Sequence, residues 1–510
     1  MAYDYSKLQN GSDIRGIAIG NNAEAINLDS EAVSRLAKGF LYLLSHNTEK
    51  EPHELCIAVG RDSRISGPDL VRDIVAALIP YGAKVLDSGL SSTPAMFMST
   101  VFEEFKCDGA IMVTASHMPS DRNGMKFFDM DGGLDKGDIA DIITFAESNS
   151  VLGRLSPGTA SEPIKVNLMD VYSAHLRKKI LDALDSGETP LLGLSITVDA
   201  GNGAGGFYAE KVLAPLGADV SSSQFLEPDG SFPNHIPNPE DKSAIESICA
   251  KVREAKTDLG LIFDTDVDRV SAVDESAKEI NRNAIVALAA ALIADSHPGS
   301  TVVTDSVTSR GLTAFLEGSL GLKHLRFKRG YRNVINMSIE LNEQGIESDL
   351  AIETSGHAAY KENFFLDDGA YLATKIVIAT AKCKNAGKGI SSLISDLSEP
   401  LESKEVRLPI KGSNFAAVGD NIIEDLRALS SSGELSECSL EEPNYEGVRI
   451  NFNSPSIKGW MLLRKSLHEP IMPLNFESDV KGGCLKIAEL LIPLLSKYED
   501  LDIGKLKELV

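Results

Sequence analysis

A short segment of the sequence places a potential nucleophile beside an imidazole and close to a cation. Thr114-Ala-Ser-His117 follows an apolar, β-branched run, and Lys126 stands a few residues further on. A loop at the end of a buried strand would hold Ser116 at the edge of a sheet, where ligands of open α/β folds bind. Nucleophile and base are normally assembled in space rather than in sequence, so the segment alone is more typical of a polar turn.

A second segment, Asp264-Thr-Asp-Val-Asp-Arg269, carries a carboxylate at every second position. In an extended segment alternate side chains lie on one face, so these carboxylates repel one another unless a cation balances them. Oxygen ligands without a nearby cysteine or histidine favour Mg²⁺. The segment lacks the glycine and the glutamate of a calcium-binding EF-hand loop. A solvated acidic turn and an aspartate-nucleophile phosphatase remain alternative interpretations.

A third segment, Glu353-Thr-Ser-Gly-His357, offers a carboxylate, a hydroxyl and an imidazole, which suit the hydroxyl groups of a sugar. Its glycine would let the backbone approach a ligand closely. Two further segments, Phe327-Lys-Arg-Gly-Tyr-Arg332 and Arg464-Lys-Ser-Leu-His-Glu-Pro470, combine cations and hydroxyls as phosphate sites do. Each segment taken by itself could also be an exposed turn or a structural feature.

The strands that must position these segments repeat along the chain. Three units each contain a short apolar strand, a helix, a second strand led by glycine and a third strand led by aspartate. The predicted strands are 56–59, 82–86 and 108–113, then 195–198, 217–220 and 258–263, then 301–304, 321–325 and 349–352. Each third strand leads into one of the three segments described first. The repeat predicts three homologous α/β domains with mixed, largely parallel sheets, whose loops could face one shared cleft.

The last part of the chain has a different pattern, which is typical of a separate α+β domain. Its predicted strands are 448–453, 460–464 and 472–476, and its helices lie near 418–429 and 484–495. The predicted domains are 1–157, 158–279, 280–400 and 401–510. Near the amino terminus, Gly11-Ser-Asp-Ile-Arg-Gly16 is too polar for a strand interior, and Ser30 is expected to cap a helix.

Composition narrows the class of protein. The 510-residue chain has a formal net charge of −24, which disfavours nucleic acid and acidic membranes as partners. Its six cysteines are scattered without a CxxC pair, as in reduced cytosolic proteins. No signal peptide opens the chain, and the longest apolar run, 284–294, is too short to span a membrane. We therefore expect a soluble cytoplasmic protein, either a monomer or a homodimer.

The order of these motifs resembles the α-D-phosphohexomutase family, which includes the phosphoglucomutases and phosphomannomutases. The resemblance covers essentially the whole chain. Ser-Gly-His357 followed by Lys361-Glu-Asn-Phe and Asp367-Asp-Gly369 is most similar to the bifunctional phosphomannomutase/phosphoglucomutase branch. The resemblance implies that the last domain is TBP-like and that the four domains surround a central cleft. It also implies isomerase activity on sugar phosphates.

The resemblance assigns roles to individual residues. It implies that Ser116 is a phosphoserine and that its phosphate binds one Mg²⁺ together with Asp264, Asp266 and Asp268. The groups implied around the transferring phosphoryl group are Arg15, His117, Lys126 and Arg269. The implied sugar contacts are Lys328, Glu353, Ser355 and His357. The implied ligands of the distal phosphate are Arg464 and Ser466. His468, in the same loop, is a further candidate for substrate binding, because its imidazole could contribute positive charge.

The reaction implied by the resemblance interconverts hexose 1-phosphate and hexose 6-phosphate, with glucose as the first expectation and mannose as a second. Phospho-Ser116 would phosphorylate the substrate to a 1,6-bisphosphate, which would turn over and return its other phosphate to Ser116. Glucose 1,6-bisphosphate is accordingly expected as an activator. The base that takes the hydroxyl proton would be Lys126 or His357.

The sequence departs from the family pattern at several positions. Leu467 and His468 stand where the phosphate loop usually has glycine and threonine, Thr265 and Val267 replace glycines of the metal loop, and Thr354 also differs. These departures leave sugar preference open. They also leave three alternatives: a sugar-bisphosphate synthase of the same fold, a phosphatase with Asp264 as nucleophile, and a non-catalytic sugar-phosphate sensor.

Overall fold

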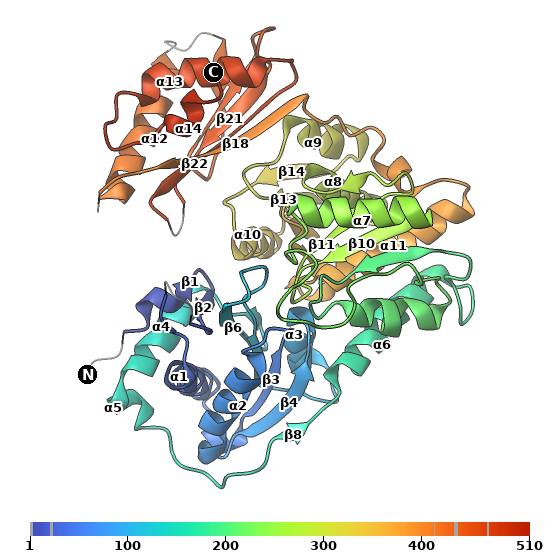
Figure 1. Cartoon of the computed structure of the whole chain (residues 1–510), viewed down its shortest axis with the longest axis vertical. Helices are drawn as coiled ribbons and strands as arrows, with labels where there is room; N and C mark the ends of the chain where they lie inside the picture. Colours follow the sequence, from blue (N-terminus) through green and yellow to red (C-terminus); the bar gives the residue numbers. More distant parts are fainter. Residues whose placement is uncertain (1–3, 21–23, 413, 433–436, 467–468) are drawn as a thin grey trace. The chain divides into compact units, whose positions relative to one another are not determined.

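The computed structural model describes residues 4–20, 24–412, 414–432, 437–466 and 469–510 (Figure 1). The chain divides into two compact units. The first unit contains Met1–Leu292 and Ser355–Ser395, and the second contains Ile293–Thr354 and Asp396–Val510. Each helix among the described residues is too short or too polar to span a lipid bilayer.

The first domain is built on an eight-stranded mixed sheet with a parallel centre (Figure 1). Strands β5, β3, β4 and β8 run parallel to one another, whereas β1, β2, β6 and β7 are attached by antiparallel pairs. The order is β1-β2-β6-β5-β3-β4-β8, with β7 paired to β6. The bounds are β1 Gln9–Asn10, β2 Asp13–Ile17, β3 Cys56–Arg61, β4 Lys84–Leu90, β5 Gly109–Val113, β6 Arg122–Asp129, β7 Gly132–Gly133 and β8 Ile164–Lys165.

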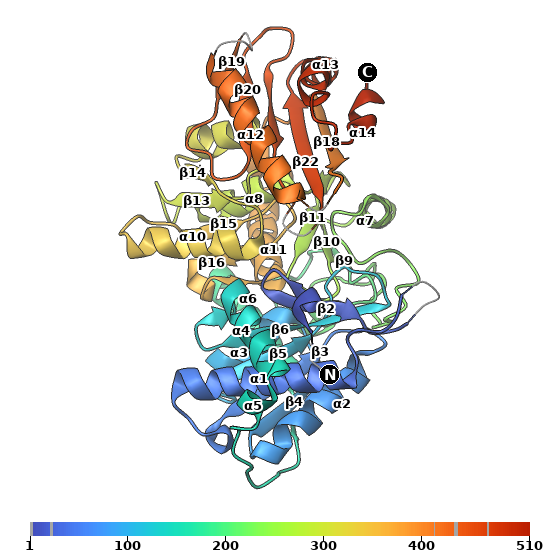
Figure 2. The same ribbon diagram turned by 90° about the vertical axis from the view of Figure 1, so that its left-hand side faces the viewer.

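Helices cover both faces of this sheet, because successive side chains of a buried strand point to opposite faces. On β6, Phe127 contacts Phe40 of α1 at a ring-centroid distance of 4.9 Å, whereas its neighbour Phe128 contacts Phe97 of α3 at 6.1 Å. Helices α1, α2 and α4 share one core with the strands (Figure 2). The bounds are α1 Ser30–Thr48, α2 Gly67–Leu78, α3 Thr93–Val101, α4 Lys136–Glu147 and α5 Asn149–Leu152.

Two expectations for the amino-terminal segment are wrong. Residues 13–17 form β2, a buried strand that pairs with β6, because Arg15 donates to Asp13 Oδ2 at 2.7 Å and to the Thr114 carbonyl. The polar side chain is thus satisfied inside the sheet. The residue that caps α1 is Asp29, whose carboxylate accepts the Ala32 N–H at 2.9 Å, so Ser30 is the first helical residue.

The second domain has a smaller mixed sheet in the order β12-β11-β10-β9, in which only β9 and β10 are parallel. The predicted strand at 217–220 contributes only an isolated bridge between Ser195 and Asp219. The strands are β9 Ile196–Asp199, β10 Leu259–Phe263, β11 Val270–Val273 and β12 Glu279–Ile280, and the helices are α6 Leu168–Leu184, α7 Lys242–Ala255 and a π-helix at Tyr208–Leu213. The same unit contains β16 Ala358–Tyr360, β17 Leu366–Asp367 and α11 Gly369–Asn385, which packs against α6.

In the second unit, β13 lies between β14 and β15, and both pairs are parallel. The bounds are β13 Thr301–Thr304, β14 Lys323–Arg326, β15 Leu350–Ile352, α9 Arg310–Ala314, a π-helix at Phe315–Ser319 and α10 Tyr331–Glu343. Helix α8, Asn283–Ala294, spans the division between the units. These elements complete the third repeat, in which a helix follows each of the first two strands.

The fourth domain is a five-stranded antiparallel sheet in the order β18-β22-β21-β20-β19, covered by helices (Figure 2). Its strands are β18 Glu402–Pro409, β19 Cys438–Leu440, β20 Val448–Phe452, β21 Gly459–Leu463 and β22 Ile471–Ser478. Its helices are α12 Phe415–Ser432, α13 Gly483–Leu495 and α14 Gly504–Lys507. Leu408, Ile450, Met461 and Phe476 belong to its apolar core. The predicted fold class, three α/β domains followed by an α+β domain, is confirmed.

A buried polar group lies on this antiparallel sheet. Glu477 Oε2 accepts the Trp460 Nε1–H at 2.9 Å, and the Arg449 guanidinium lies 3.6 Å from the centre of the Trp460 ring. Burial raises the pKa of Glu477 to about 7, although the Trp460 hydrogen bond and the Arg449 charge oppose this shift. The folded domain therefore holds a proton that the unfolded chain would release.

We expect Glu477→Gln to stabilise the fourth domain above neutral pH. From about pH 4.5 to 7 the folded state keeps a proton that the unfolded state loses, so wild-type stability falls as the pH rises. At pH 8 the variant should have a free energy of unfolding higher by on the order of 2–3 kcal/mol, and most of the gain should disappear near pH 5. Urea unfolding at the two pH values, followed by the fluorescence of Trp460, the single tryptophan, measures this free energy. An equal gain at both pH values would contradict this expectation.

Candidate active site

The Ser116 loop and the triple-aspartate turn meet within the first unit. Strand β5 ends at Val113 and leads into the Ser116 loop, while β10 ends at Phe263 and turns into β11 through Asp264–Arg269. The Ser116 hydroxyl donates to Asp264 Oδ2 at 2.8 Å. The Thr93 hydroxyl of the first domain donates to Asp266 Oδ2 at 2.5 Å, and the Thr93 N–H donates to the Asp266 carbonyl. Two domains thus build one polar centre.

The triple-aspartate turn is held in a tight conformation by hydrogen bonds from its backbone N–H groups to the Asp264 side chain. Asp264 Oδ1 accepts the N–H groups of Val267 at 3.0 Å and Arg269 at 3.3 Å. Val267 has φ of 68°, which is unfavourable for a β-branched residue. The side chain of Val267 is fully buried, so packing compensates for the strain. The turn therefore fixes the directions in which the three carboxylates point.

The three carboxylates form a buried group that can hold a metal ion. One oxygen from each of Asp264, Asp266 and Asp268 lies within 4.8 Å of the others, and all three side chains are fully buried. Burial and the other two carboxylates raise the pKa of Asp264 well above its usual value. Asp266 Oδ1 and Asp268 Oδ1 have no hydrogen-bond partner among the described residues. Such unsatisfied carboxylate oxygens fit a divalent cation that prefers oxygen ligands.

Cationic and neutral donors surround this group. Lys126 on β6 donates to Asp268 Oδ2 and lies 3.5 Å from Asp266 Oδ2. Arg269 Nε and Nη2 are both 3.2 Å from Asp264 Oδ2, and Arg269 Nη2 also donates to His117 Nδ1 at 2.6 Å. His117 is exposed as a residue, but the loss of water around its ring within the site and the charges of Arg269 and Arg15 lower its pKa, so the ring is neutral near pH 7. Arg15 binds the Thr114 carbonyl next to the loop.

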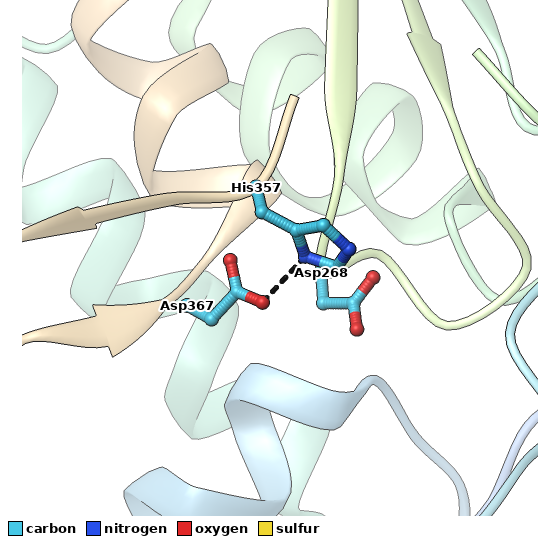
Figure 3. Close-up of side chains that lie close together, drawn as sticks. All are labelled: Asp268, His357 and Asp367. Carbon is cyan, nitrogen blue, oxygen red and sulfur yellow. Dashed lines mark hydrogen bonds and ion pairs between the residues drawn. The ribbon is translucent and has the colours of Figure 1, made fainter. Parts of the chain in front are cut away.

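His357 lies beside the same carboxylates, as Figure 3 shows. Its Nδ1–H donates to Asp367 Oδ2 of β17 at 2.6 Å, and Asp268 completes a group of three potential ligand atoms within 4.8 Å. Burial lowers the pKa of His357, but the carboxylates of Asp367 and Asp268 outweigh it and raise the value to about 9. The Asp367 hydrogen bond at Nδ1 fixes the orientation of the His357 ring beside Asp268.

The glycine of the third segment approaches the protein rather than a ligand. Gly356 has φ of 93°, and a Cβ there would lie 2.7 Å from the Val270 carbonyl of β11. The next residue, His357, forms an antiparallel bridge with Arg269. Only glycine allows this close contact, which places His357 beside the triple-aspartate turn. The same segment contains Ser355, whose Oγ is buried and has no hydrogen-bond partner among the described residues.

Sequence reasoning missed the side chains that brace the Ser116 loop. The fully buried Arg64 donates from Nη2 to the Ser116 and Met118 carbonyls at 2.6 and 2.5 Å, and from Nη1 to the Pro119 and Arg122 carbonyls at 2.7 and 2.9 Å. Asp62 accepts from Thr114 Oγ1 at 2.7 Å, and Thr114 Oγ1 in turn accepts the Ser116 N–H at 2.9 Å.

These braces hold Ser116 at φ of 48°, a left-handed conformation that is costly for serine. The sequence signal that could have identified Asp62 and Arg64 was their position in the chain. Asp62 and Arg64 follow β3, the neighbour of β5, so their loop begins at the same edge of the sheet as the Ser116 loop.

The remaining predicted site residues belong to the second unit, except for Ser355. Glu353 Oε1 accepts the Gly330 N–H at 2.6 Å, which joins the third segment to the loop that carries the exposed Lys328. Arg464 and Ser466 lie on the hairpin loop between β21 and β22, and Ser466 N–H donates to the Ile471 carbonyl at 3.0 Å. The predicted substrate-binding residue His468, with Leu467, lies outside the described residues.

Comparison with known proteins identifies the three α/β domains. Residues 6–150, 170–277 and 281–401 match the family described as phosphoglucomutase/phosphomannomutase, alpha/beta/alpha domains I, II and III, respectively. A phosphomannomutase/phosphoglucomutase of Pseudomonas aeruginosa is 32% identical over 431 residues, which cover 84% of each chain. A phosphoglucomutase of Neisseria gonorrhoeae is 30% identical over 435 residues, which cover 84% of this chain and 86% of that protein.

The fold has a close match among solved structures. A phosphoglucomutase/phosphomannomutase family protein of Burkholderia thailandensis has a TM-score of 0.78 and 24% identity, and the match covers 98% of both chains. The match includes the antiparallel fourth domain, so it supports the whole four-domain architecture. With the sequence matches, it confirms the resemblance drawn from the motifs: the chain belongs to the phosphoglucomutase/phosphomannomutase family, the α-D-phosphohexomutases, and is a mutase of the isomerase class.

Proposed function

We propose that this mutase interconverts hexose 1-phosphate and hexose 6-phosphate through a phosphate carried on Ser116 and a 1,6-bisphosphate intermediate. The observation that supports this most directly is the 2.8 Å hydrogen bond between the Ser116 hydroxyl and Asp264 of the triple-aspartate turn. A phosphate on this hydroxyl would be formed next to buried carboxylates that need a cation. The nucleophile and the ion-binding turn therefore work as one site.

Asp264, Asp266 and Asp268, with a phosphate oxygen on Ser116, would hold one Mg²⁺. When bound, the ion would neutralise charge on the phosphoryl oxygens during transfer. Lys126, Arg269 and Arg15 would supply further positive charge, and His117 a neutral side chain beside Ser116. Cations that are already fixed in place before the reaction lower the barrier, because the phosphoryl transition state spreads negative charge over its oxygens.

We assign the proton transfer to His357 rather than to Lys126. Lys126 donates to Asp268 and neighbours Asp266, so its ammonium group serves to balance charge. His357 is oriented by Asp367, and its raised pKa of about 9 keeps the ring mostly protonated near pH 7, so that it donates a proton from its major form and accepts one from its minor, neutral form. Because the reaction is reversible, one group must act as acid in one direction and as base in the other, which an oriented imidazole can do.

Substrate recognition completes the proposal. Lys328, Glu353, Ser355 and His357 would contact the sugar, and Arg464, Ser466 and His468 the distal phosphate. Glucose is the first substrate to test and mannose the second, because the relatives are named phosphoglucomutase and phosphomannomutase/phosphoglucomutase. The same proposal includes glucose 1,6-bisphosphate as an activator and a cytoplasmic location. It also includes domain boundaries at residues 157, 279 and 400.

The phosphatase alternative is disfavoured by the surroundings of Asp264. Both of its oxygens accept hydrogen bonds, from the Ser116 hydroxyl, from Arg269 and from the turn backbone. A carboxylate held in this way is suited to ligation and positioning rather than to attack on a phosphoryl group. A bisphosphate synthase of the same fold would also use Ser116, and only product analysis with and without added glucose 1,6-bisphosphate distinguishes it.

We expect Ser116→Ala to abolish mutase activity, because no other hydroxyl contacts Asp264 among the described residues. The wild-type peptide containing Ser116 should gain the mass of one phosphate, about 80 Da, after incubation with glucose 1,6-bisphosphate. Mass spectrometry of the intact protein and of its peptides measures this mass gain. Ser120→Ala, in the same loop, is the control and should keep both activity and phosphate. A Ser116→Ala protein with wild-type turnover would refute the phosphoserine.

Removal of divalent ions should abolish activity, and Mg²⁺ should restore it. Asp266→Asn should weaken Mg²⁺ binding by about tenfold or more, because it removes one charged ligand from a buried set. Isothermal titration with Mg²⁺ measures the affinity independently of turnover. The exposed Asp229→Asn is the matched control in the same domain and should bind Mg²⁺ like the wild type. Full activity in the presence of excess chelator would contradict the metal assignment.

His357→Gln should lower kcat by roughly a hundredfold or more with a much smaller change in KM, because general acid–base catalysis contributes about 10²–10⁴-fold. Asp367→Asn should lower kcat less, since the imidazole remains but loses its orienting carboxylate. Steady-state kinetics with glucose 1-phosphate and with glucose 6-phosphate measure both directions. If instead Lys126→Met lowered kcat with an unchanged KM, and His357→Gln were fully active, the acid–base role would be assigned to Lys126.

A further inference from the structure

The proposed phosphate ligand Arg464 has a carboxylate beside it. Arg464 Nη1 lies 3.7 Å from Glu446 Oε1, and the two side chains are 10% and 12% exposed. Arg464 Nε is buried and has no hydrogen-bond partner among the described residues, and Nη1 donates a long hydrogen bond of 3.5 Å to the Lys465 carbonyl. The guanidinium is therefore held near Glu446 but is not saturated, which leaves it able to bind an anion.

Glu446 is fixed from the opposite side by two loops of the third domain. Its Oε2 accepts the Ser306 hydroxyl at 2.5 Å and the Arg329 N–H at 3.2 Å. These loops follow β13 and β14, and both partners lie in the second unit with Glu446. The adjacent Tyr445 ring also contacts Phe327 with 4.9 Å between ring centroids. One carboxylate oxygen is thus anchored, and the other faces the guanidinium.

The backbone brings Glu446 this close to Arg464 through Gly447. Gly447 has φ of 60°, and a Cβ there would lie 2.2 Å from the Leu463 carbonyl and 2.9 Å from Arg464 Cα. Any other residue would push the turn away from the end of β21. The Gly447 carbonyl is held by Arg427 Nη2 at 3.0 Å and by Asn444 Nδ2 at 3.1 Å. The contact between Glu446 and Arg464 is therefore built into the turn.

We propose that Glu446 is a positioning residue that competes with the substrate's distal phosphate for the Arg464 guanidinium. This inference rests on the proposed function, in which Arg464 grips that phosphate. A carboxylate next to the guanidinium both orients it and repels an incoming dianion. Such a competitor keeps phosphate binding weak, which suits a reaction in which the bisphosphate must be released, reoriented and bound again by its other phosphate.

The charge balance around Arg464 is consistent with this role. Burial lowers the pKa of Arg464, and the nearby Arg329 lowers it further, whereas Glu446 opposes both effects. Loss of the Glu446 charge would therefore leave the buried guanidinium with less compensation. A phosphate dianion would then be the partner that restores the balance, so it should bind more tightly.

Glu446→Gln tests the inference, because the amide keeps the size and an acceptor oxygen for Ser306 and Arg329 but removes the charge. We expect KM for glucose 1-phosphate, and the inhibition constant of inorganic phosphate, to fall roughly three- to tenfold, the size of effect that a partly screened charge pair exerts. The value of kcat should fall as release slows. Glu424→Gln, on the exposed face of α12, is the matched control and should leave these constants unchanged.

A second variant should shift KM in the opposite direction. Ser306→Ala removes one anchor of Glu446 and lets the carboxylate move toward Arg464, so competition should increase and KM should rise. A merely structural role would raise KM in both variants. Trp460 fluorescence verifies that each protein retains its native fourth domain. The inference is overturned if Glu446→Gln leaves or raises KM, or if Ser306→Ala lowers it.

Arg464→Gln separates this inference from the proposed function. If Arg464→Gln raises KM and Glu446→Gln does not lower it, only the role of Glu446 is overturned. If Arg464→Gln leaves KM unchanged, the assignment of Arg464 to the distal phosphate fails, and the inference fails with it. In the double variant the effect of Glu446→Gln on KM should disappear, because the guanidinium for which it competes is absent.

Discussion

Electrostatic repulsion among three buried carboxylates is the constraint around which the first unit is organised. Asp264, Asp266 and Asp268 cannot all be ionised at this separation without nearby positive charge. Lys126 from the first domain, Arg269 from the turn itself and the proposed Mg²⁺ share the compensation. Because the compensating groups come from different segments, the first and second domains must assemble correctly before the carboxylates can be ionised. The same assembly brings the Ser116 hydroxyl to Asp264.

The chain path explains how His357 joins this group. After β15 the chain leaves the second unit at Thr354 and enters the first unit at Ser355. Two residues later His357 forms a bridge with Arg269 and a hydrogen bond with Asp367. Glu353, on the other side of this crossing, binds the Gly330 N–H in the second unit. One five-residue segment therefore connects the proposed sugar contacts to the triple-aspartate turn.

Sequence patterns predicted the elements that repeat along the chain. They did not predict elements that depend on hydrogen bonds between a side chain and backbone groups far away in the sequence. Strands at 56–59, 258–263 and 301–304 were foreseeable because apolar runs and glycine or aspartate boundaries recur in each domain. The strand β2 was not, because its polarity is compensated by Arg15 binding Thr114, 99 residues away. The site residues with recognisable chemistry were also foreseeable. Arg64 was not, since it recognises backbone carbonyls, which have no signature in the sequence.

Arg64 and Glu446 illustrate one principle in the two units. Each is a charged side chain that binds other protein groups and thereby determines the position of a functional group. Arg64 positions the Ser116 loop, and Glu446 positions Arg464. Burying a charged side chain costs desolvation energy, so a buried charge is better explained by the position that it gives to a functional group than by a gain in stability. In the proposed reaction, which gives one phosphate to the sugar and takes back the other, the loop that would carry the phosphoryl group must be rigid, whereas the group that holds the far end must release it. An arginine that donates hydrogen bonds to the backbone carbonyls of the loop and a competing carboxylate are physically suited to these two opposite requirements.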